Sequence, residues 1–551
     1  MKANRTILYQ TGIIIAAALL FIPFLGNVHL FDWDEINFAE SAREMILSKN
    51  YLTVQVNFMP FWEKPPLFIW MQVLSMKIFG INEFAARFPD AVCGIVSLFL
   101  IFNIGRKFKD ENFGLIWVLV YVGSLLPFFY FKSGIIDPWF NFFIFLSIYL
   151  FILAVNLDSK KYLYIILSAA SLGLAVLTKG PVAILIFALT AGIYWIIKKF
   201  RLHISFLQLA TFAVVLIIVG GFWFILQILN GHFNVVVEFI QYQIRLFQTK
   251  DAGHGGFLFY HFVVLLVGVF PASVFAIQGF KKSKTDNPLQ NDVRLWMTIL
   301  FWTVLILFTI VKTKIVHYSS LCYFPMTYLA ARSLYKIIQG EFHFRLWQTI
   351  LLSLLALILG IIGILFPLLD HYKQWLIDRG YISHPFTIGN LQAQVHWLGY
   401  EWITGIILLA GVFLAIVFLY RKKLRKGIML LFGSSLIFVY LTMVLLTPRI
   451  EGYVQKSAIN FFKNTSEKDA YMYSFYKSYA LYFYGKKQMN ENKKAEDITW
   501  LTKGNIDKPV YFIMRVDKLP EIKAQYPQIK ILKNDNGYVI GVRYPDDKKS
   551  N

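Results

Sequence analysis

Long apolar runs, each about the length of a membrane-crossing helix, alternate with short polar segments along most of the chain. Roughly 20 apolar residues are needed to span a bilayer in helical form. We interpret thirteen runs as transmembrane helices, and the pattern predicts an all-α polytopic membrane body over residues 1–446. The runs cover residues 7–26, 88–106, 113–131, 137–156, 161–178, 181–197, 206–229, 257–278, 293–312, 315–336, 346–367, 399–420 and 427–446.

The pattern changes after residue 446. Of the 54 basic and 32 acidic residues in the chain, 31 lie in its last 105 residues. Segments such as VYFIMRV and YVIGVRY alternate apolar and polar positions, as strands with one buried face do. Residues 447–551 are therefore expected to form a soluble α/β domain, separate from the membrane body.

The segment between the first two apolar runs, residues 27–87, is the longest loop of the membrane body. Within FDWDEINFAESAREMILSKN the apolar positions recur at helical spacing, which predicts an amphipathic helix lying along the membrane interface. A second short helix is expected over residues 67–79, after Lys64-Pro65-Pro66. Together these elements would roof a cavity without crossing the membrane.

Composition supports a membrane protein and excludes a cytosolic enzyme or a disordered chain. The sequence is 57% hydrophobic and only 16% charged, against about 25% charged in average soluble domains. The net charge of +22 comes from short basic clusters between apolar runs, so no nucleic-acid partner is expected. Cys93 and Cys322 both lie within apolar runs, so neither a disulfide framework nor a CxxC metal site is predicted.

The basic clusters predict the orientation of the chain. If the N-terminus is cytoplasmic, that side also collects Arg106-Lys107, Lys160-Lys161, Lys198-Lys199 and the RKKLRK run at 421–426. The outer short loops hold far fewer basic residues, which is the positive-inside pattern. Because thirteen is odd, the domain at 447–551 is expected outside.

Acidic residues gather at the start of the outer loop. Asp32 and Glu35 have the spacing of a helix capping box, while Glu40 and Glu44 fit a solvated helix face. Asp34 lies between Trp33 and the expected interfacial helix, where desolvation would suit its carboxylate to proton abstraction.

Ionisable residues at the edges of the apolar runs provide a second signal. Asp137, Lys179, Lys312 and Lys314 are flanked by apolar helix and fall on the outer side, as do Lys64 and Arg245. A single such lysine usually extends its ammonium to the membrane surface. Several cations on the side that normally lacks them would bind an anion such as phosphate. His254, in a Gly-rich turn before a predicted helix, could donate to a phosphate oxygen or simply bond to backbone.

Six motifs occur in an order that resembles a known family. They are DWDEINFAESAREM, FWEKPPLFIW, IIDPW, LTKGP, KDAGHGGFLFYH and KTKIVHYSSLCYFP. Their order and spacing are similar to those of the bacterial aminoarabinose transferases of lipid A, and more broadly to the protein O-mannosyltransferase superfamily of membrane glycosyltransferases with the GT-C fold. The resemblance covers most of the first 340 residues and extends to YKSYALYFYGKK in the tail.

The resemblance implies a multi-pass enzyme of the bacterial inner membrane. Its donor would be a sugar on a polyprenyl phosphate such as undecaprenyl phosphate, and its acceptor lipid A or an exported protein, at the outer face among membrane lipids. Carried over motif by motif, Asp34, Glu35 and Asp137 would be catalytic, and six residues would bind the donor phosphate: Lys64, Lys179, Arg245, His254, Lys312 and Lys314. Fixed cations of this kind stabilise a departing phosphate, so no metal or other cofactor is expected.

One departure and two alternatives stay open. Where the aminoarabinose transferases typically read D-E-T-R-Y-A-E, this chain has Asn37 in place of the arginine, which leaves the sugar and the acceptor undetermined. A lipid-linked sugar flippase or transporter would also carry charges among many spans, although transporters tend to have internal repeats, and none is evident here. A structural or sensor protein with a cell-wall-binding tail would need no acidic first loop.

Overall fold

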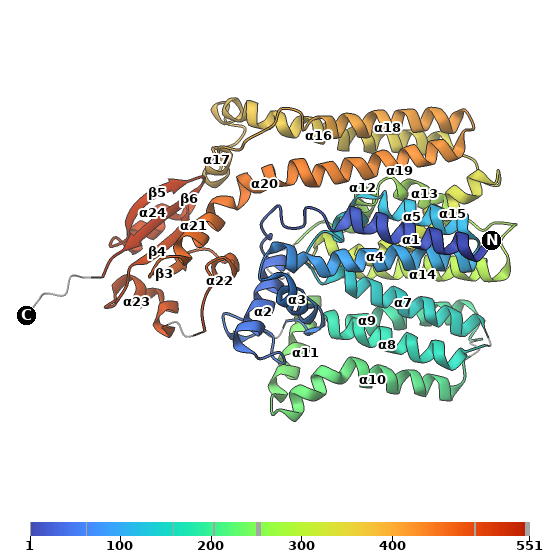
Figure 1. Cartoon of the computed structure of the whole chain (residues 1–551), viewed down its shortest axis with the longest axis horizontal. Coiled ribbons are helices and arrows are strands. Elements are labelled where there is room, and N and C mark those ends of the chain that lie inside the picture. Colours follow the sequence, from blue (N-terminus) through green and yellow to red (C-terminus); the bar gives the residue numbers. More distant parts are fainter. Residues whose placement is uncertain are drawn as a thin grey trace, which may run out of the picture.

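The computed structural model describes residues 2–61, 63–157, 159–201, 204–248, 255–489 and 492–545. Most of the chain is a bundle of roughly parallel and antiparallel helices, with a smaller mixed domain at one end (Figure 1). The helices of the bundle are α1 (Lys2–Phe21), α4 (Glu83–Phe108), α5 (Glu111–Val122), α6 (Leu125–Tyr130), α7 (Asp137–Asn156), α8 (Lys161–Lys179), α9 (Val182–Ile197), α10 (Phe206–Leu229), α11 (Phe233–Gln248), α12 (Tyr260–Gly268), α13 (Ala272–Gly279), α14 (Pro288–Ile310), η2 (Val316–Cys322), α15 (Tyr323–Ile338), α16 (Leu346–Asp378), α17 (Pro385–Leu391), α18 (Ile403–Tyr420), α19 (Leu424–Leu441) and the π-helical turn η3 (Thr442–Leu446).

Each of the thirteen apolar runs carries helix, which confirms the prediction of an all-α polytopic body. In the described part of the chain, nine helices are long and apolar enough to cross a membrane. A tenth span results if α12 and α13, which meet at 110°, are taken together. Other runs form shorter helices such as Glu111–Val122 and Val182–Ile197. Thirteen spans therefore stays a prediction.

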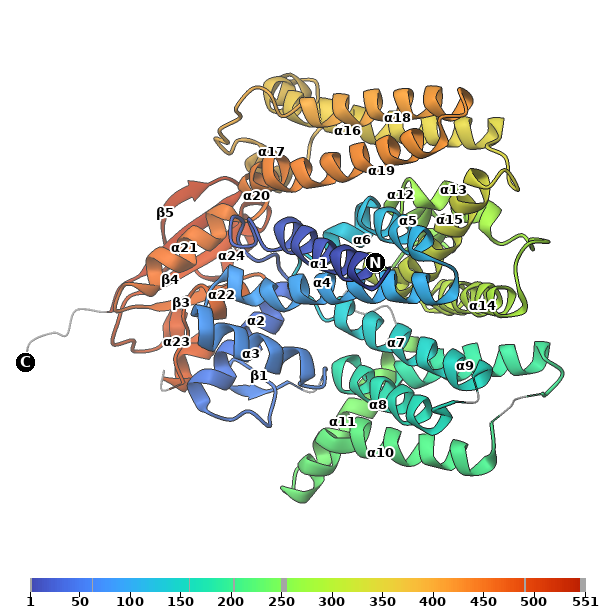
Figure 2. The same cartoon turned by 45° about the vertical axis from the view of Figure 1, so that its right-hand side comes forward.

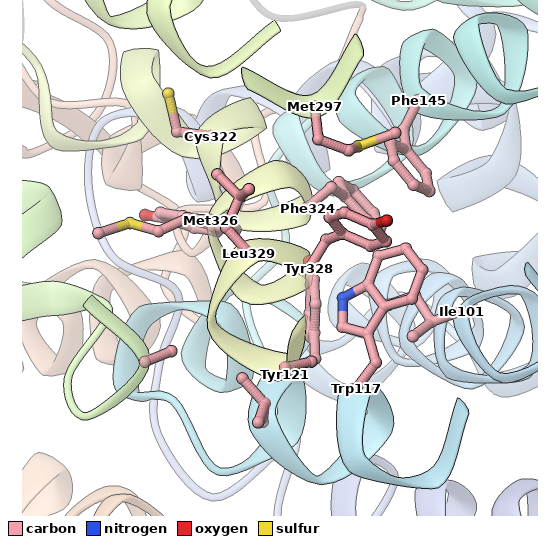
Figure 3. Packing of buried hydrophobic residues seen from close by; sticks show 14 of the residues in the cluster. Ile101, Trp117, Tyr121, Phe145, Met297, Cys322, Phe324, Met326, Tyr328 and Leu329 are labelled. Atoms are coloured by element: carbon pink, nitrogen blue, oxygen red, sulfur yellow. The ribbon is translucent and has the colours of Figure 1, made fainter. Parts of the chain in front are cut away.

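Aromatic side chains join the helices at the centre of the bundle (Figure 3). Phe145 of α7 and Phe324 of α15 stack with ring centroids 4.3 Å apart. Trp117 of α5 packs edge-on against Tyr328 and donates its indole N–H to Thr327 Oγ1 at 3.1 Å. Since neighbouring helices are as apolar as lipid, such close packing and interhelical hydrogen bonds are what hold a membrane bundle together.

The first loop forms both expected helices, α2 (Asp34–Ser48) and α3 (Leu67–Phe79), joined by an unpredicted two-stranded hairpin of β1 (Gln55–Val56) and β2 (Met59–Pro60). The amphipathic interfacial position expected for α2 is wrong, because every residue from Glu35 to Met45 is buried. The helix packs between α3 and the C-terminal domain rather than against open interface.

The acidic residues of this loop have roles that differ from those expected. Asp32 does not cap α2; its carboxylate accepts hydrogen bonds from Ser478 Oγ and from the Tyr479 amide. Glu40 and Glu44 are fully buried rather than solvated. Glu40 forms a two-pronged pair with Arg43, and Glu44 accepts from the hairpin amides of Asn57 and Phe58. Asp32 thus links the first loop to the C-terminal domain, and Glu44 links α2 to the hairpin.

The C-terminal part is an α/β unit, as predicted. Its four-stranded sheet has the order β3-β4-β6-β5, with β3 and β4 parallel and the other pairs antiparallel. The predicted strands VYFIMRV and YVIGVRY are β4 and β6. The elements are α20 (Thr447–Val454), α21 (Lys456–Ser466), β3 (Tyr471–Ser474), α22 (Ala480–Phe483), η4 (Lys493–Glu496), α23 (Ile498–Lys503), β4 (Val510–Arg515), η5 (Val516–Lys518), α24 (Leu519–Gln525), β5 (Lys530–Asp535) and β6 (Tyr538–Arg543).

The C-terminal domain is docked on the first loop. Figures 1 and 2 both place α22 beside α2 at one end of the bundle, and Figure 1 shows the N-terminus at the opposite end. The Leu30 amide donates to Tyr484 Oη at 2.7 Å, and His29 Nδ1 lies 2.9 Å from Glu451 Oε1. The expected boundary at residue 446 falls within the continuous helical run of α19, η3 and α20, so helix passes directly from the bundle into this domain.

Candidate functional site

A cavity of about 510 Å³ lies where the first loop, the outer ends of the bundle helices and the C-terminal domain meet. Pockets of roughly 300–1,000 Å³ are typical of small-molecule and cofactor sites. Its walls include six of the nine residues predicted from sequence, which are Asp34, Glu35, Lys64, Asp137, Lys179 and Arg245. Residues more than 200 positions apart in the sequence therefore face one space.

Two carboxylates meet at one histidine in this cavity. Asp34 is the first residue of α2 and Asp137 the first of α7. His317 Nε2, from η2, lies 3.6 Å from Asp34 Oδ2 and 3.9 Å from Asp137 Oδ2. The Asp34 side chain is 41% exposed, whereas that of Asp137 is 3% exposed. Asp34 is therefore the exposed carboxylate of the pair. The burial expected for it from the sequence is not found.

Asp137 is held by a lysine that the sequence analysis assigned to phosphate. Lys179 Nζ, at the last residue of α8, donates to Asp137 Oδ1 at 2.6 Å. The same ammonium lies over the Tyr318 ring at 5.2 Å. Lys179 thus faces the cavity while neutralising Asp137, and an incoming anion would share this cation with the carboxylate.

Glu35 is a structural residue rather than a free catalytic acid. Its carboxylate receives Arg87 through Nε at 3.0 Å and Nη2 at 2.7 Å, and also accepts from the Phe31 and Gly134 amides. Burial alone would raise the pKa of Glu35, but the Arg87 cation and these hydrogen bonds outweigh it and lower the pKa. With every oxygen engaged, Glu35 fixes the start of α2 and so orients Asp34 beside it.

Two cations flank one aromatic ring on another wall. Lys64 Nζ and Arg245 Cζ each lie 5.1 Å from the centroid of the Tyr242 ring. The Tyr242 hydroxyl donates to Glu63 Oε2 at 3.1 Å. Burial lowers the pKa of Lys64, while the nearby Glu63 and Asp34 carboxylates oppose that change. An anion bound here would face a guanidinium and an ammonium held in place by the same ring.

Two predicted phosphate ligands, Lys314 and Lys312, are not part of this arrangement. Lys314 is buried, and its ammonium donates to the carbonyls of Phe308, Thr309 and Val311 at 2.9, 2.6 and 2.7 Å. It caps the C-terminal end of α14, which uses up its three donors. Lys312 is exposed and lies outside the cavity lining. His254 lies outside the described residues.

The sequence analysis missed several residues that line the cavity. His317 lies three residues after Lys314 in KTKIVHYSSLCYFP, a motif from which only Lys312 and Lys314 were selected. Lys477 and Tyr479 come from the C-terminal domain, within the segment YKSYALYFYGKK, which shares the resemblance but had not looked catalytic. Lys477 Nζ lies 4.5 Å from the ring of Trp33, which in turn packs edge-on against Tyr479. The docking of this domain shows that both residues line the cavity.

The remaining wall is apolar. It is formed by Ile135, Ile136, Phe140, Val182, Ile186, Phe308, Val311, Ile315 and Leu321. The cavity thus has a charged part near Asp34 and an apolar part between bundle helices, which suits an amphiphile with an anionic head and a hydrocarbon chain. Among the residues described, no cluster of three or more His, Cys, Asp or Glu is placed to hold a metal ion.

The chain is similar to several known proteins. A family profile described as "Dolichyl-phosphate-mannose-protein mannosyltransferase" matches residues 63–223. A protein of Wigglesworthia glossinidia brevipalpis named undecaprenyl phosphate-alpha-4-amino-4-deoxy-L-arabinose arabinosyl transferase is 27% identical over 344 residues, or 61% of this chain and 60% of the relative. One of the same name from Enterobacter sp. (strain 638) is 25% identical, covering 59% of each chain. The matched region thus spans about three fifths of these curated relatives.

A solved structure is similar over nearly the whole chain. The crystal structure of ArnT from Cupriavidus metallidurans bound to undecaprenyl phosphate superposes with a TM-score of 0.77 at 16% sequence identity, covering 97% of this chain and 98% of that one. The molecule is therefore a multi-pass membrane protein with the GT-C type of fold. The resemblance to the aminoarabinose transferases that the motifs indicated is confirmed.

Proposed function

We propose that this protein is a glycosyltransferase that moves a sugar from a polyprenyl-phosphate donor, such as undecaprenyl phosphate, to lipid A at the outer face of the bacterial inner membrane. The observation that carries the proposal is one cavity in which Asp34 is open beside His317 and Asp137, while Lys64, Arg245 and Lys179 line the same space. The named relatives act on a donor of this class, and the matching structure holds undecaprenyl phosphate.

The cations suit the departure of the donor phosphate. As the bond between the sugar C1 and the phosphate oxygen breaks, its electron pair stays on the phosphate, which gains negative charge. Lys64 and Arg245, both held against Tyr242, would stabilise that charge more in the transition state than in the ground state. The apolar wall would hold the polyprenyl chain.

The carboxylates suit the acceptor. An acceptor oxygen forms the new bond to C1 with its own electron pair while polyprenyl phosphate leaves. If that oxygen belongs to a hydroxyl, Asp34 takes its proton, since this carboxylate is exposed to the cavity. If it belongs to an ionised phosphate, no proton is lost and Asp34 and His317 position the acceptor. Inversion at C1 is expected for a single displacement.

A second acceptor class is supported by the family profile, whose description concerns a protein mannosyltransferase. Transfer to a hydroxyl of an exported protein would use the same cavity, with Asp34 as base. Mass spectrometry of lipid A and of exported proteins, from cells with and without this gene, separates the two acceptors by the added sugar mass.

Membrane orientation belongs to the same proposal. The cavity opens beside the C-terminal domain, so that domain, taken as residues 447–551, would lie outside and the N-terminus in the cytoplasm. In this orientation residues 1–446 form the membrane body, and the first loop at 27–87 and the C-terminal domain cover its outer end.

Reconstitution tests the reaction. Purified protein in proteoliposomes would receive undecaprenyl phosphate carrying radiolabelled 4-amino-4-deoxy-L-arabinose, together with lipid A. We expect label in a covalent lipid A product, and less of it at limiting acceptor with Asp34→Asn protein of equal folded content. Label that crosses the bilayer still attached to undecaprenyl phosphate would instead establish the flippase alternative.

A further inference from the structure

A second cavity, of about 470 Å³, lies within the C-terminal domain beside the first. It is bounded by the end of β3, the loop that follows it, α22 and η4, with Asn57 of the first-loop hairpin on one side. The lining is rich in aromatic side chains, including Tyr473, Phe475, Tyr476, Tyr479 and Tyr482.

Three of the four tyrosines that line this cavity present free hydroxyl groups. Among the described residues, the hydroxyls of Tyr473, Tyr479 and Tyr482 have no hydrogen-bond partner. Burial raises the pKa of each of the three phenols, so they remain neutral hydroxyls near pH 7. Each therefore offers an apolar ring face together with a group that both donates and accepts. A ligand with C–H faces and many hydroxyls, that is a saccharide, matches this lining.

A cation stands where the two cavities meet. Lys477 and Tyr479 line both of them. Lys477 is exposed, has no carboxylate partner among the described residues, and lies over the Trp33 ring, next to Asp34. The other lysine of the cavity, Lys487, is already paired with Glu496 at 2.9 Å. The unpaired ammonium would attract an anionic group at the border nearest the reacting carboxylates.

We propose that this second cavity is the acceptor subsite, which binds the phosphorylated saccharide headgroup of the acceptor. The saccharide would lie against the tyrosine rings, and its phosphate would contact Lys477, which directs it toward Asp34 in the first cavity. This inference rests on the proposed function and assigns to the C-terminal domain a direct part in acceptor recognition.

Direct binding tests the subsite without any sugar transfer. The probe is the deacylated, bisphosphorylated glucosamine disaccharide of lipid A, titrated by calorimetry into the full-length protein in detergent. We expect Tyr482→Ala and Lys477→Ala each to weaken binding by about tenfold, and Lys477→Arg to retain most of it. Tyr544→Ala is the matched control, since Tyr544 is an exposed aromatic residue of the same domain outside the cavity.

A kinetic measurement separates this subsite from a general loss of structure. In the reconstituted reaction both variants should raise the KM for the acceptor by about the same factor, with the KM for the donor unchanged. Wild-type disaccharide affinity in both variants would overturn the subsite, as would equal competition by inorganic phosphate alone. Disaccharide binding that depends on Tyr482 and Lys477, without sugar transfer, would overturn the proposed function and leave the subsite standing. Sugar transfer with an acceptor KM that is unchanged in both variants would overturn the subsite and leave the proposed function standing.

Discussion

At the scale of single residues, neighbours in sequence have opposite environments. Asp34 opens onto the cavity, while Glu35 accepts four hydrogen bonds and is paired with Arg87. Both carboxylates belong to the first turn of α2, so the motif alone gives them equal weight. The helix phase and the position of Arg87 on α4 decide which one is available for chemistry.

Replacing Asp34 with Asn tests its role and separates acceptor classes. Asparagine keeps the size and hydrogen bonding of the side chain but cannot take a proton. If the acceptor is a hydroxyl, turnover should fall by about 10²–10⁴-fold with donor binding retained. If it is a phosphate, the main effect should be a higher acceptor KM. Wild-type kinetics in a folded Asp34→Asn protein would remove this residue from the site.

The cation pair around Tyr242 is expected to control donor use. Lys64→Ala and Arg245→Ala each remove a charged contact to the donor phosphate, at a cost of about 1.5–3 kcal/mol. Catalytic efficiency at limiting donor should therefore fall by roughly tenfold to over a hundredfold. Lys282→Ala, an exposed lysine outside the cavity, is the control. Unchanged efficiency in both site variants would contradict the assignment.

At the scale of elements, some charged residues that were expected to bind phosphate or face solvent instead hold helix ends and loops in place. Lys314 closes the end of α14, and Glu44 closes the hairpin onto α2. A lysine ammonium can bind phosphate or cap a helix end, because buried backbone carbonyls also need hydrogen-bond donors. The same element contacts hold the roof of the cavity in place.

Lys314→Met should affect stability rather than donor binding. The methionine fills a similar volume but leaves three carbonyls of the α14 end without donors, at a cost of roughly 1–3 kcal/mol. We expect a lower thermal midpoint in detergent and an unchanged donor KM. A raised donor KM with a wild-type midpoint would restore Lys314 to the phosphate site.

Glu44 should make the stability of the protein depend on pH. Burial raises its pKa to about 8, with the nearby Glu40 carboxylate adding to the rise. A carboxyl that holds its proton more tightly when folded contributes stability that is present below its unfolded pKa of about 4.3 and is lost as pH rises through about 8. As the pH is raised from 5 to 9, the thermal unfolding midpoint of the wild-type protein should therefore decrease by more than that of Glu44→Gln. Parallel curves for the two proteins would exclude Glu44 as the cause.

At the scale of the whole molecule, the bundle and the C-terminal domain build the site jointly. Figure 1 shows the basic turns α7–α8 and α18–α19 at the end that holds the N-terminus, and the cover of α2 and the C-terminal domain at the other end. Basic turns at one end and the cavity at the other are the arrangement that the positive-inside pattern predicts for an outward-facing site.

Reporter fusions test that orientation. A periplasm-active reporter fused after residue 446 should be active, and one inserted at Lys422 should be inactive, with the reverse result for a cytoplasm-active reporter. The basic run at 421–426 and the odd number of predicted spans both require this outcome. The opposite pair of results would invert the side on which the cavity opens.

The sequence by itself determined the membrane class, the positions of the helices and the two short helices of the first loop, because apolar length and periodicity are local properties of the chain. Four of the six motifs also marked five residues that line the cavity, and Arg245 was marked by its place on the outer side. Only the tertiary structure decided that Glu35 is tied to Arg87, that Lys314 caps a helix, and that His317 lies between Asp34 and Asp137. It alone brought Lys477 and Tyr479 to the cavity. These outcomes depend on which distant groups meet, and no local pattern encodes the partner that a charged side chain will find after folding.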